Sequence, residues 1–210
     1  MAWVVSVDLG SRCKRLNVIE HRKSPATGIF GALFATIIFM RKLFTPCVVH
    51  QGPKILLGMK KVGLGAGRWN GFGGKVEPGE AIDVAAVREL REEVCIETLD
   101  IRQKGILEFS FENNPKILEV HVFEATKFSG TPAETEEMTP CWFDLAKIPY
   151  EQMWSDDIHW LPLLLAGKTF HGKFHFDQPS TANYSAKILS QELREVSTLW
   201  LSCHFYILSS

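Results

Sequence analysis

The sequence GKVEPGE at residues 74–80, followed by RELREE at residues 88–93, indicates both the fold and the chemistry of this chain. Glu92 and Glu93 follow Glu89 by three and four residues, so the three side chains can reach one region of a helix surface. Like charges at this spacing repel and destabilise a helix that has no use for them. Mg²⁺ binds through a few carboxylates together with substrate phosphates, so the pattern favours a magnesium site over a solvated acidic face.

The complete pattern is glycine, five residues, glutamate, seven residues, and then Arg-Glu-apolar-any-Glu-Glu. It resembles the signature motif of the Nudix family, whose members hydrolyse nucleoside diphosphates linked to another moiety. One position departs from the motif, because Cys95 stands where the family has glycine. Glycine adopts the left-handed conformation that ends many helices without steric cost. We therefore expect Cys95 to cost roughly 1 kcal/mol of stability without removing the chemistry.

The composition is that of an ordinary globular protein, with 210 residues, 46% of them hydrophobic, 22% charged, and a formal net charge of −1. No basic excess points to stable nucleic-acid binding, and we expect a monomer. The five cysteines form no Cys-x-x-Cys or zinc-ligand spacing. We therefore expect reduced thiols and a cytoplasmic location, with the mitochondrion and the nucleus as alternatives.

Three segments are expected along the chain. Residues 1–40 contain an apolar run at 28–40 that is too short to span a bilayer, so we expect a poorly ordered N-terminal extension and no membrane contact. Organelle targeting or membrane tethering by this extension is the alternative. Residues 41–198 are expected to form a Nudix hydrolase domain, and residues 199–210 an apolar C-terminal tail.

Periodicity predicts alternating strands and helices within the domain. Pro46 predicts an edge position or a bulge in its strand, because proline cannot donate to the ladder. The resemblance implies an α/β fold of the Nudix type, an α/β/α sandwich with a mixed sheet. In the first half we expect strands 44–50 and 54–60 as a hairpin, a glycine loop at 63–74 and a helix at 78–94. Strands 106–111 and 117–127 then flank a turn at 113–115, and a strand at 141–143 follows. The last elements are a helix at 158–165, a strand at 173–176, and a closing element at 188–196 that the pattern assigns neither to helix nor to strand.

A closer resemblance extends beyond the motif. The segments LLGMKK (56–61), GAGRWNGFGGKV (65–76), EMTPCWF (137–143) and MWSDD (153–157) are similar to the MutT-type Nudix enzymes that act on oxidised purine nucleoside triphosphates. The resemblance covers about residues 41–198. It implies a small-molecule nucleotide substrate, such as 8-oxo-dGTP or 2-hydroxy-dATP, that is hydrolysed to the monophosphate and pyrophosphate, which keeps damaged bases out of DNA and RNA.

A pocket for the damaged purine is expected around Trp154, with Phe72 and Phe109 as neighbouring rings. Asp156 and Asp157 are adjacent acids, and in a partly dry pocket the two do not both ionise easily. One acid would then donate a hydrogen bond to the base edge while the other accepts one. A change in which acid holds the proton would let one pocket accept both oxidised guanine and oxidised adenine.

The resemblance also assigns residues to the metal, the phosphates and the base. Mg²⁺ is the implied cofactor, and Glu93, then Glu92 and Glu89, are the implied catalytic residues. The implied metal ligands or metal-adjacent groups are the backbone carbonyls of Gly73 and Gly74 and the side chains of Glu89, Glu92, Glu93 and Glu137. The implied substrate contacts are Thr45, Lys60, Asn70 and Lys75. We expect Arg88 to hold a carboxylate in place and Glu80 to orient the helix.

Two other functions stay open at this point. The first is a Nudix protein that binds nucleotides without hydrolysing them, which Pro46, Cys47 and Cys95 favour as departures from the expected pattern. The second is a Nudix hydrolase for a nucleotide sugar, a dinucleotide polyphosphate or capped RNA. Trp154 beside the two aspartates favours a purine base over these substrates.

Overall fold

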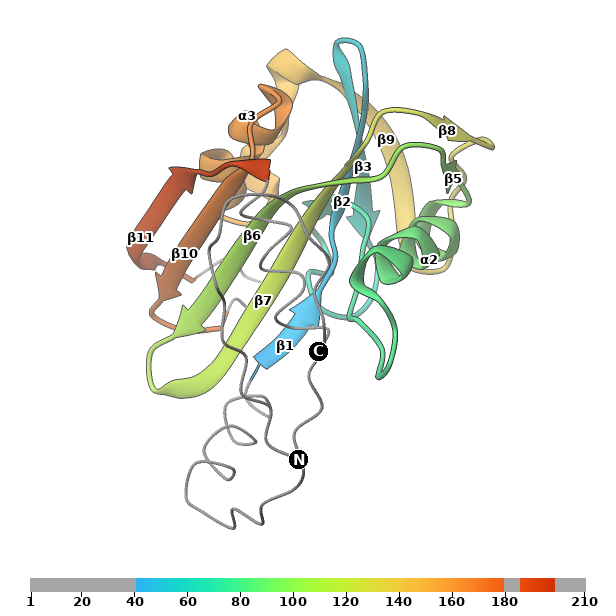
Figure 1. Cartoon of the computed structure of the whole chain (residues 1–210). Coiled ribbons are helices and arrows are strands. Elements are labelled where there is room, and N and C mark those ends of the chain that lie inside the picture. Colours follow the sequence, from blue (N-terminus) through green and yellow to red (C-terminus); the bar gives the residue numbers. More distant parts are fainter. Residues whose placement is uncertain (1–40, 180–185, 199–210) are drawn as a thin grey trace, which may run out of the picture. The chain divides into compact units, whose positions relative to one another are not determined.

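A computed structural model describes residues 41–179 and 186–198 of the chain (Figure 1). The expectations for residues 1–40 and 199–210 lie outside the described residues. Within the described residues, no helix is long and apolar enough to cross a membrane.

Nine of the described strands form one mixed sheet. Its main path is β11 (Ile188–Glu195), β10 (Phe170–Phe176), β6 (Arg102–Phe111), β7 (Asn114–Ala125), β2 (Cys47–Gln51), β3 (Lys54–Lys60) and β4 (Trp69–Asn70). β1 (Arg41–Phe44) pairs with β7 in parallel, and β9 (Met138–Asp144) pairs with β3 in antiparallel orientation. The sheet is mixed, as expected. β7 pairs in parallel with β1 and β2, and β6 pairs in parallel with β10, whereas the other pairs are antiparallel.

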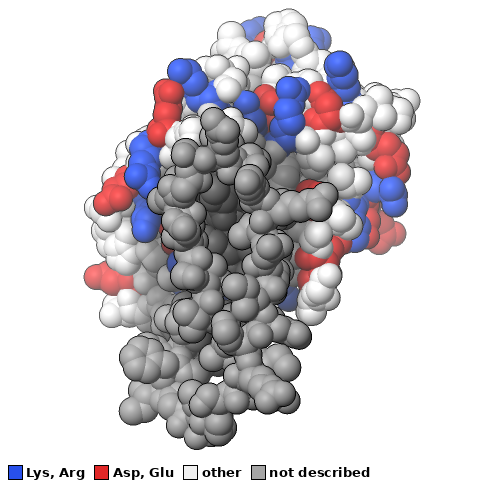
Figure 2. Space-filling view, in the orientation of Figure 1, with Lys and Arg blue, Asp and Glu red and all other residues white. Residues whose placement is uncertain are grey.

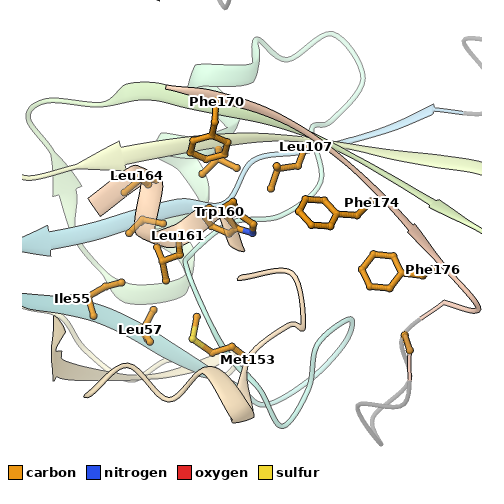
Figure 3. Packing of buried hydrophobic residues seen from close by; sticks show 13 residues of the cluster. Ile55, Leu57, Leu107, Met153, Trp160, Leu161, Leu164, Phe170, Phe174 and Phe176 are labelled. Atoms are coloured by element: carbon orange, nitrogen blue, oxygen red, sulfur yellow. The ribbon is translucent and has the colours of Figure 1, made fainter. Parts of the chain in front are cut away.

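Two helices pack on opposite faces of this sheet, so the fold is an α/β/α sandwich (Figure 1). Side chains alternate along β2, where Val48 belongs to the core on the side of α3 (Asp157–Leu165) and Val49 to the core on the side of α2 (Ile82–Val94). Figure 3 shows the α3-side core, in which Trp160 and Leu161 of α3 pack with phenylalanines of β10. Ile82, Ala86 and Leu90 of α2 are buried, as the 3.6-residue period predicts.

Short elements complete the described domain. β5 (Glu97–Thr98) and β8 (Phe128–Ser129) pair with each other beyond the end of α2. The 3₁₀ turns η1 (Leu145–Lys147) and η2 (Tyr150–Gln152) connect β9 to α3.

The expected first strand is divided in two. β1 and β2 both pair with β7, and Pro46 lies between them, where its carbonyl accepts a hydrogen bond from Phe123 N at 2.9 Å. Pro46 interrupts the strand as a bulge would, because it has no N–H for the ladder. The hairpin between β2 and β3 is confirmed, and the closing element at 188–196 is a strand.

Three local expectations can be compared with the structure. Cys95 is the C-cap of α2, with φ 61° and ψ 30°, so a cysteine does occupy the left-handed position. The helix begins at Ile82 and not at residue 78, after a turn in which Gly79 has φ +82°. β7 begins at Asn114, so the hairpin turn is one residue earlier than expected and uses Asn113 at φ 57°.

Candidate active site

A cavity of about 760 Å³ lies on the α3 side of the sheet. Its lining includes Lys60, Gly73, Gly74 and Glu137, which were expected near the metal and the phosphates. The same cavity is lined by residues expected at the base, namely Asn70, Phe109, Trp154, Asp156 and Asp157. The fold therefore brings members of the two expected groups to one cavity, whereas Glu89, Glu92 and Glu93 lie beside it and do not line it.

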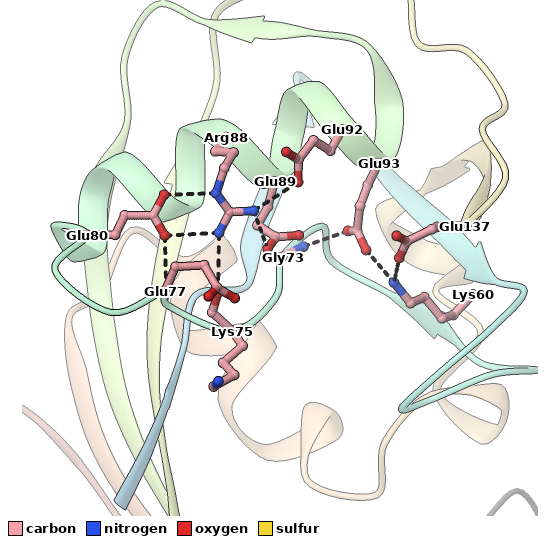
Figure 4. Close-up of polar contacts among 10 residues, drawn as sticks. All are labelled: Lys60, Gly73, Lys75, Glu77, Glu80, Arg88, Glu89, Glu92, Glu93 and Glu137. Atoms are coloured by element: carbon pink, nitrogen blue, oxygen red, sulfur yellow. Dashed lines mark hydrogen bonds and ion pairs between the residues drawn. The ribbon is translucent and has the colours of Figure 1, made fainter. Parts of the chain in front are cut away.

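Arg88 organises the carboxylates along α2 (Figure 4). Its guanidinium donates to both oxygens of Glu80, at 2.8 and 3.0 Å, in the bidentate geometry that suits arginine. Its Nη1 donates to Glu89 at 2.8 Å and to Glu92 at 2.9 Å. Arg88 thus neutralises the like charges on the helix, and it holds carboxylates in place, as expected. Glu80 in turn accepts from Glu77 N at 3.1 Å, which ties the turn before α2 to the helix.

Glu93 joins the helix to the glycine loop and to β3. It is 1% exposed, and its Oε2 accepts a hydrogen bond from Gly73 N at 2.7 Å. Its Oε1 lies 2.5 Å from Lys60 Nζ, which also lies 2.6 Å from Glu137 Oε2 (Figure 4). Burial raises the pKa of Glu93. One ammonium group therefore bridges two of the expected metal ligands.

Glu89 packs against Gly74. A Cβ on residue 74 would lie 2.3 Å from Glu89 Oε1, which is too close for any side chain. The absence of a side chain on Gly74 is therefore what lets the carboxylate approach the backbone of the loop. Burial raises the pKa of Glu89, whereas Glu92 stays exposed.

These carboxylates are held by ion pairs with Arg88 and Lys60. Within the described residues, no three His, Cys, Asp or Glu side chains already converge to hold a metal ion. The expected donors nevertheless lie close together, since Glu89 and Glu92 share one arginine nitrogen and Glu93 contacts the loop that Glu89 touches.

The two aspartates are buried beside Trp154. Asp156 accepts a hydrogen bond from Trp160 Nε1 at 3.0 Å, and Asp157 accepts one from Trp154 N at 3.1 Å. Burial raises the pKa of Asp156 to about 6. Burial and the neighbouring charge of Asp156 raise the pKa of Asp157 well above its usual range. The pair therefore resists double ionisation near neutral pH, in agreement with the expected behaviour.

Arg68 is a residue of this site that sequence reasoning missed. Its side chain is almost fully buried, and its guanidinium carbon lies 4.1 Å from the centre of the Trp154 ring. A cation stacked on the ring holds Trp154 in place, and its charge opposes the rise in the pKa of both aspartates. The GRW sequence at residues 67–69 contains no signal for this contact.

Three expected substrate contacts do not line the cavity. Phe72 is fully buried in the α2-side core, because its neighbours Gly71 and Gly73 are the residues that face the cavity. Thr45 is also fully buried, and its hydroxyl has no hydrogen-bond partner among the described residues. The Lys75 carbonyl accepts from Arg88, and its ammonium group points away from the carboxylates (Figure 4).

Comparison with known proteins now decides the family. The NUDIX domain model matches residues 40–164, which is more than half of the chain. The chain belongs to the Nudix family. Nudix hydrolases act on phosphoric anhydride bonds and generally use a divalent metal ion, so this Nudix protein is a hydrolase of that class with a small-molecule nucleotide substrate.

The Nudix protein is similar to two named hydrolases over most of their length. It is 47% identical to the oxidized purine nucleoside triphosphate hydrolase of Mus musculus, over 75% of this chain and 97% of the mouse protein. It is 50% identical to the protein of that name in Danio rerio, over 66% of this chain and 89% of the fish protein. The solved structure of a MutT protein from Bacillus halodurans has a TM-score of 0.62 and 25% identity, over 72% of this chain and 97% of that protein.

Proposed function

We propose that this Nudix protein hydrolyses oxidised purine nucleoside triphosphates, such as 8-oxo-dGTP and 2-hydroxy-dATP, to the monophosphate and pyrophosphate. The observation that carries the proposal is that one cavity is lined both by the buried pair Asp156 and Asp157 and by Glu137 and Lys60 beside Glu93. The names of the mouse and zebrafish relatives support the same substrate class.

The base end of the cavity suits an oxidised purine. Trp154 offers a flat face, which Arg68 supports from one side, and Phe109 is a second ring in the lining. A protonated aspartate donates to a base edge, and an ionised one accepts from it, so the pair can match an edge that carries both a donor and an acceptor. Asn70 adds an amide, whose nitrogen donates to Arg68 O at 3.0 Å and whose oxygen stays available to the base.

The residues at the other end fit a divalent cation. The Lys60 ammonium lies between Glu93 and Glu137, which supports the view that this pair of carboxylates accommodates a cation. Glu89 occupies the space that a Cβ on Gly74 would fill, so a hard oxygen donor lies against the glycine loop. The residues that would hold Mg²⁺ are the carboxylates of Glu89, Glu92, Glu93 and Glu137 and the carbonyls of Gly73 and Gly74. Mg²⁺, when bound, neutralises phosphate charge and polarises the phosphoryl oxygen.

The chain's own residues supply the rest of the chemistry. Glu93 is buried and oriented by Gly73, so it is our choice for the base that takes a proton from the attacking water. Glu92 and Glu89 complete the catalytic set, with Arg88 fixing both. Lys60 lines the cavity and offsets the negative charge of the phosphates, whereas Lys75 and Thr45, which do not line it, have no part in the proposed chemistry.

The remaining expectations concern partners and location. Acidic and basic side chains are interspersed where described residues are visible in Figure 2, which supports a small nucleotide over a nucleic acid as the ligand. A monomeric state and a cytoplasmic, mitochondrial or nuclear location stay predictions.

One assay tests the proposal. Release of pyrophosphate is measured from normal and oxidised purine triphosphates, with and without Mg²⁺, alongside a nucleotide sugar and a dinucleotide polyphosphate. We expect Mg²⁺-dependent turnover with oxidised purines strongly preferred. Equal rates on oxidised and normal purines, or preference for the nucleotide sugar, would refute the substrate assignment. Tight binding of oxidised purine triphosphates without turnover would refute the proposal as well.

A further inference from the structure

Two lysines on neighbouring strands line the cavity and have no role in the proposed hydrolysis. Lys42 lies on β1 and Lys116 on β7, and both belong to the cavity lining. β1 and β7 pair in parallel, with Lys42 opposite Leu118. Lys116 lies two residues before Leu118 and therefore on the same face of the sheet. The Cα atoms of the two lysines are then about 8 Å apart, near enough for both side chains to reach one ligand group.

Among the described residues, no opposite charge compensates these lysines. The other charged residues in the lining all have polar partners, since Lys60 pairs with Glu137, Asp156 binds Trp160, and Asp157 binds Trp154 N. Within residues 41–179 and 186–198, no ion pair or side-chain hydrogen bond joins Lys42 or Lys116 to another residue. Two ammonium groups that have no partner in the described part of the chain create a positive potential, which favours an anion there.

The surroundings of the two lysines suit a phosphate group. Asn114 also lines the cavity, and its Oδ1 accepts from Lys116 N at 3.0 Å, which leaves the amide nitrogen as a further donor. Phe44, two residues after Lys42, bridges to Lys75, which follows Gly74 in the glycine loop. Lys42 is therefore about 7 Å along the strand from the residue that contacts this loop, a span that a polyphosphate chain can cover.

We propose that Lys42, Lys116 and Asn114 form a second anion subsite, which binds a phosphate group of the nucleotide distant from the bond that is cleaved. The inference rests on the proposed function for the identity of the nucleotide. The phosphate has two sources, the terminal phosphate of the triphosphate or a phosphate on the ribose. The proximity of β1 to the glycine loop favours the terminal phosphate.

The test compares two double variants with equal net charge. Lys42→Gln/Lys116→Gln removes the subsite, and Lys54→Gln/Lys147→Gln removes two exposed lysines that do not line the cavity. Steady-state kinetics are measured on 8-oxo-dGTP, 8-oxo-dGDP and a 3′-phosphorylated 8-oxo-dGTP. We expect the subsite variant to raise KM for the triphosphate at least about tenfold, with kcat and the diphosphate KM little changed. A loss confined to the 3′-phosphorylated substrate would assign the subsite to a ribose phosphate.

Equal KM values for the subsite variant and the control on all three substrates would overturn the inference. If the wild-type chain hydrolyses none of these nucleotides, the proposed function fails, and the subsite is tested by calorimetry with inorganic tripolyphosphate. Binding at least about tenfold weaker in the subsite variant than in the control then supports the subsite. Equal tripolyphosphate affinity in the two variants overturns it.

Discussion

Gly74 and Glu89 approach each other so closely that a Cβ on residue 74 would lie 2.3 Å from the carboxylate oxygen. This close contact explains why the family motif has glycine at this position. A side chain on residue 74 would occupy the space that the Glu89 carboxylate fills beside the loop. The contact links the two halves of the motif, the glycine turn and the acidic helix, in one piece of geometry.

Gly74→Ala is therefore expected to displace Glu89 and to lower kcat/KM about 100-fold, as misplacement by about 1 Å can do. Steady-state kinetics check the loss of activity, and a urea titration checks that the fold persists. Gly52→Ala is the matched control, since a Cβ there meets nothing within 4 Å. Its φ of +55° makes it cost about 1 kcal/mol of stability, but activity should stay at the wild-type level. Wild-type activity in Gly74→Ala would contradict the role of the Glu89 contact.

Glu93→Gln tests the general base. Glutamine keeps the shape and can still accept a hydrogen bond from Gly73, and Lys60 keeps its ion pair with Glu137. The variant should therefore fold normally, while kcat falls about 100-fold or more through loss of proton transfer and of negative charge. Glu134→Gln removes an exposed carboxylate that pairs with Lys61 and does not line the cavity, and it should leave kcat unchanged. Full turnover by Glu93→Gln would remove Glu93 from the mechanism.

The aspartate pair should make substrate choice depend on pH. Because the pKa of Asp156 is raised to about 6, the protonation state of the pair changes between pH 5 and pH 7.5. We expect the ratio of KM values for 8-oxo-dGTP and 2-hydroxy-dATP to vary across this range in the wild type and to follow a different pH profile in Asp156→Asn, where Asp157 alone can titrate. Identical pH profiles for both substrates in both proteins would count against a proton exchange between the two acids.

The helix and the hairpins could be predicted because their signals are local. Ile82, Ala86 and Leu90 recur at helical spacing, and the same face is buried in the structure. β11 could not be assigned, because most of its residues are exposed and carry no alternation. Its conformation depends on antiparallel pairing with β10, a contact that no property of its own residues announces.

The candidate site shows the same limit. Asp156 and Asp157 could be singled out because adjacent acids beside Trp154 are unusual in a sequence. The stacking of Arg68 on Trp154 could not, since it depends on how the β3–β4 loop and the segment before α3 meet in space. Phe72 was expected at the base. Successive residues of this extended segment face opposite sides, so Gly71 and Gly73 face the cavity and the Phe72 side chain lies in the α2-side core.

Cys95 offers a test of the departure from the family motif. At φ 61° it pays the steric cost of the left-handed region, whereas glycine would not. Cys95→Gly should raise the free energy of unfolding by about 0.5 kcal/mol, because relief of strain exceeds the added entropy of the unfolded chain. Cys95→Ala keeps the strain and should show no gain. Equal stability of the two variants in urea titrations would mean that the helix end is not strained.

Asp156 should also make stability depend on pH, in the direction opposite to an ordinary carboxylate. Its pKa is about 6 in the folded state and near 3.8 when unfolded, so the folded protein binds the extra proton between these values. Stability from this group is complete below pH 3.8 and is lost as the pH rises through 6. Asp156→Asn can still accept the hydrogen bond from Trp160 and never ionises. Relative to the wild type, it should therefore gain up to about 3 kcal/mol between pH 4 and pH 7 in urea titrations. Asp83 is exposed, so the control Asp83→Asn should show no such change. A constant stability difference between Asp156→Asn and the wild type across this pH range would show that Asp156 titrates normally.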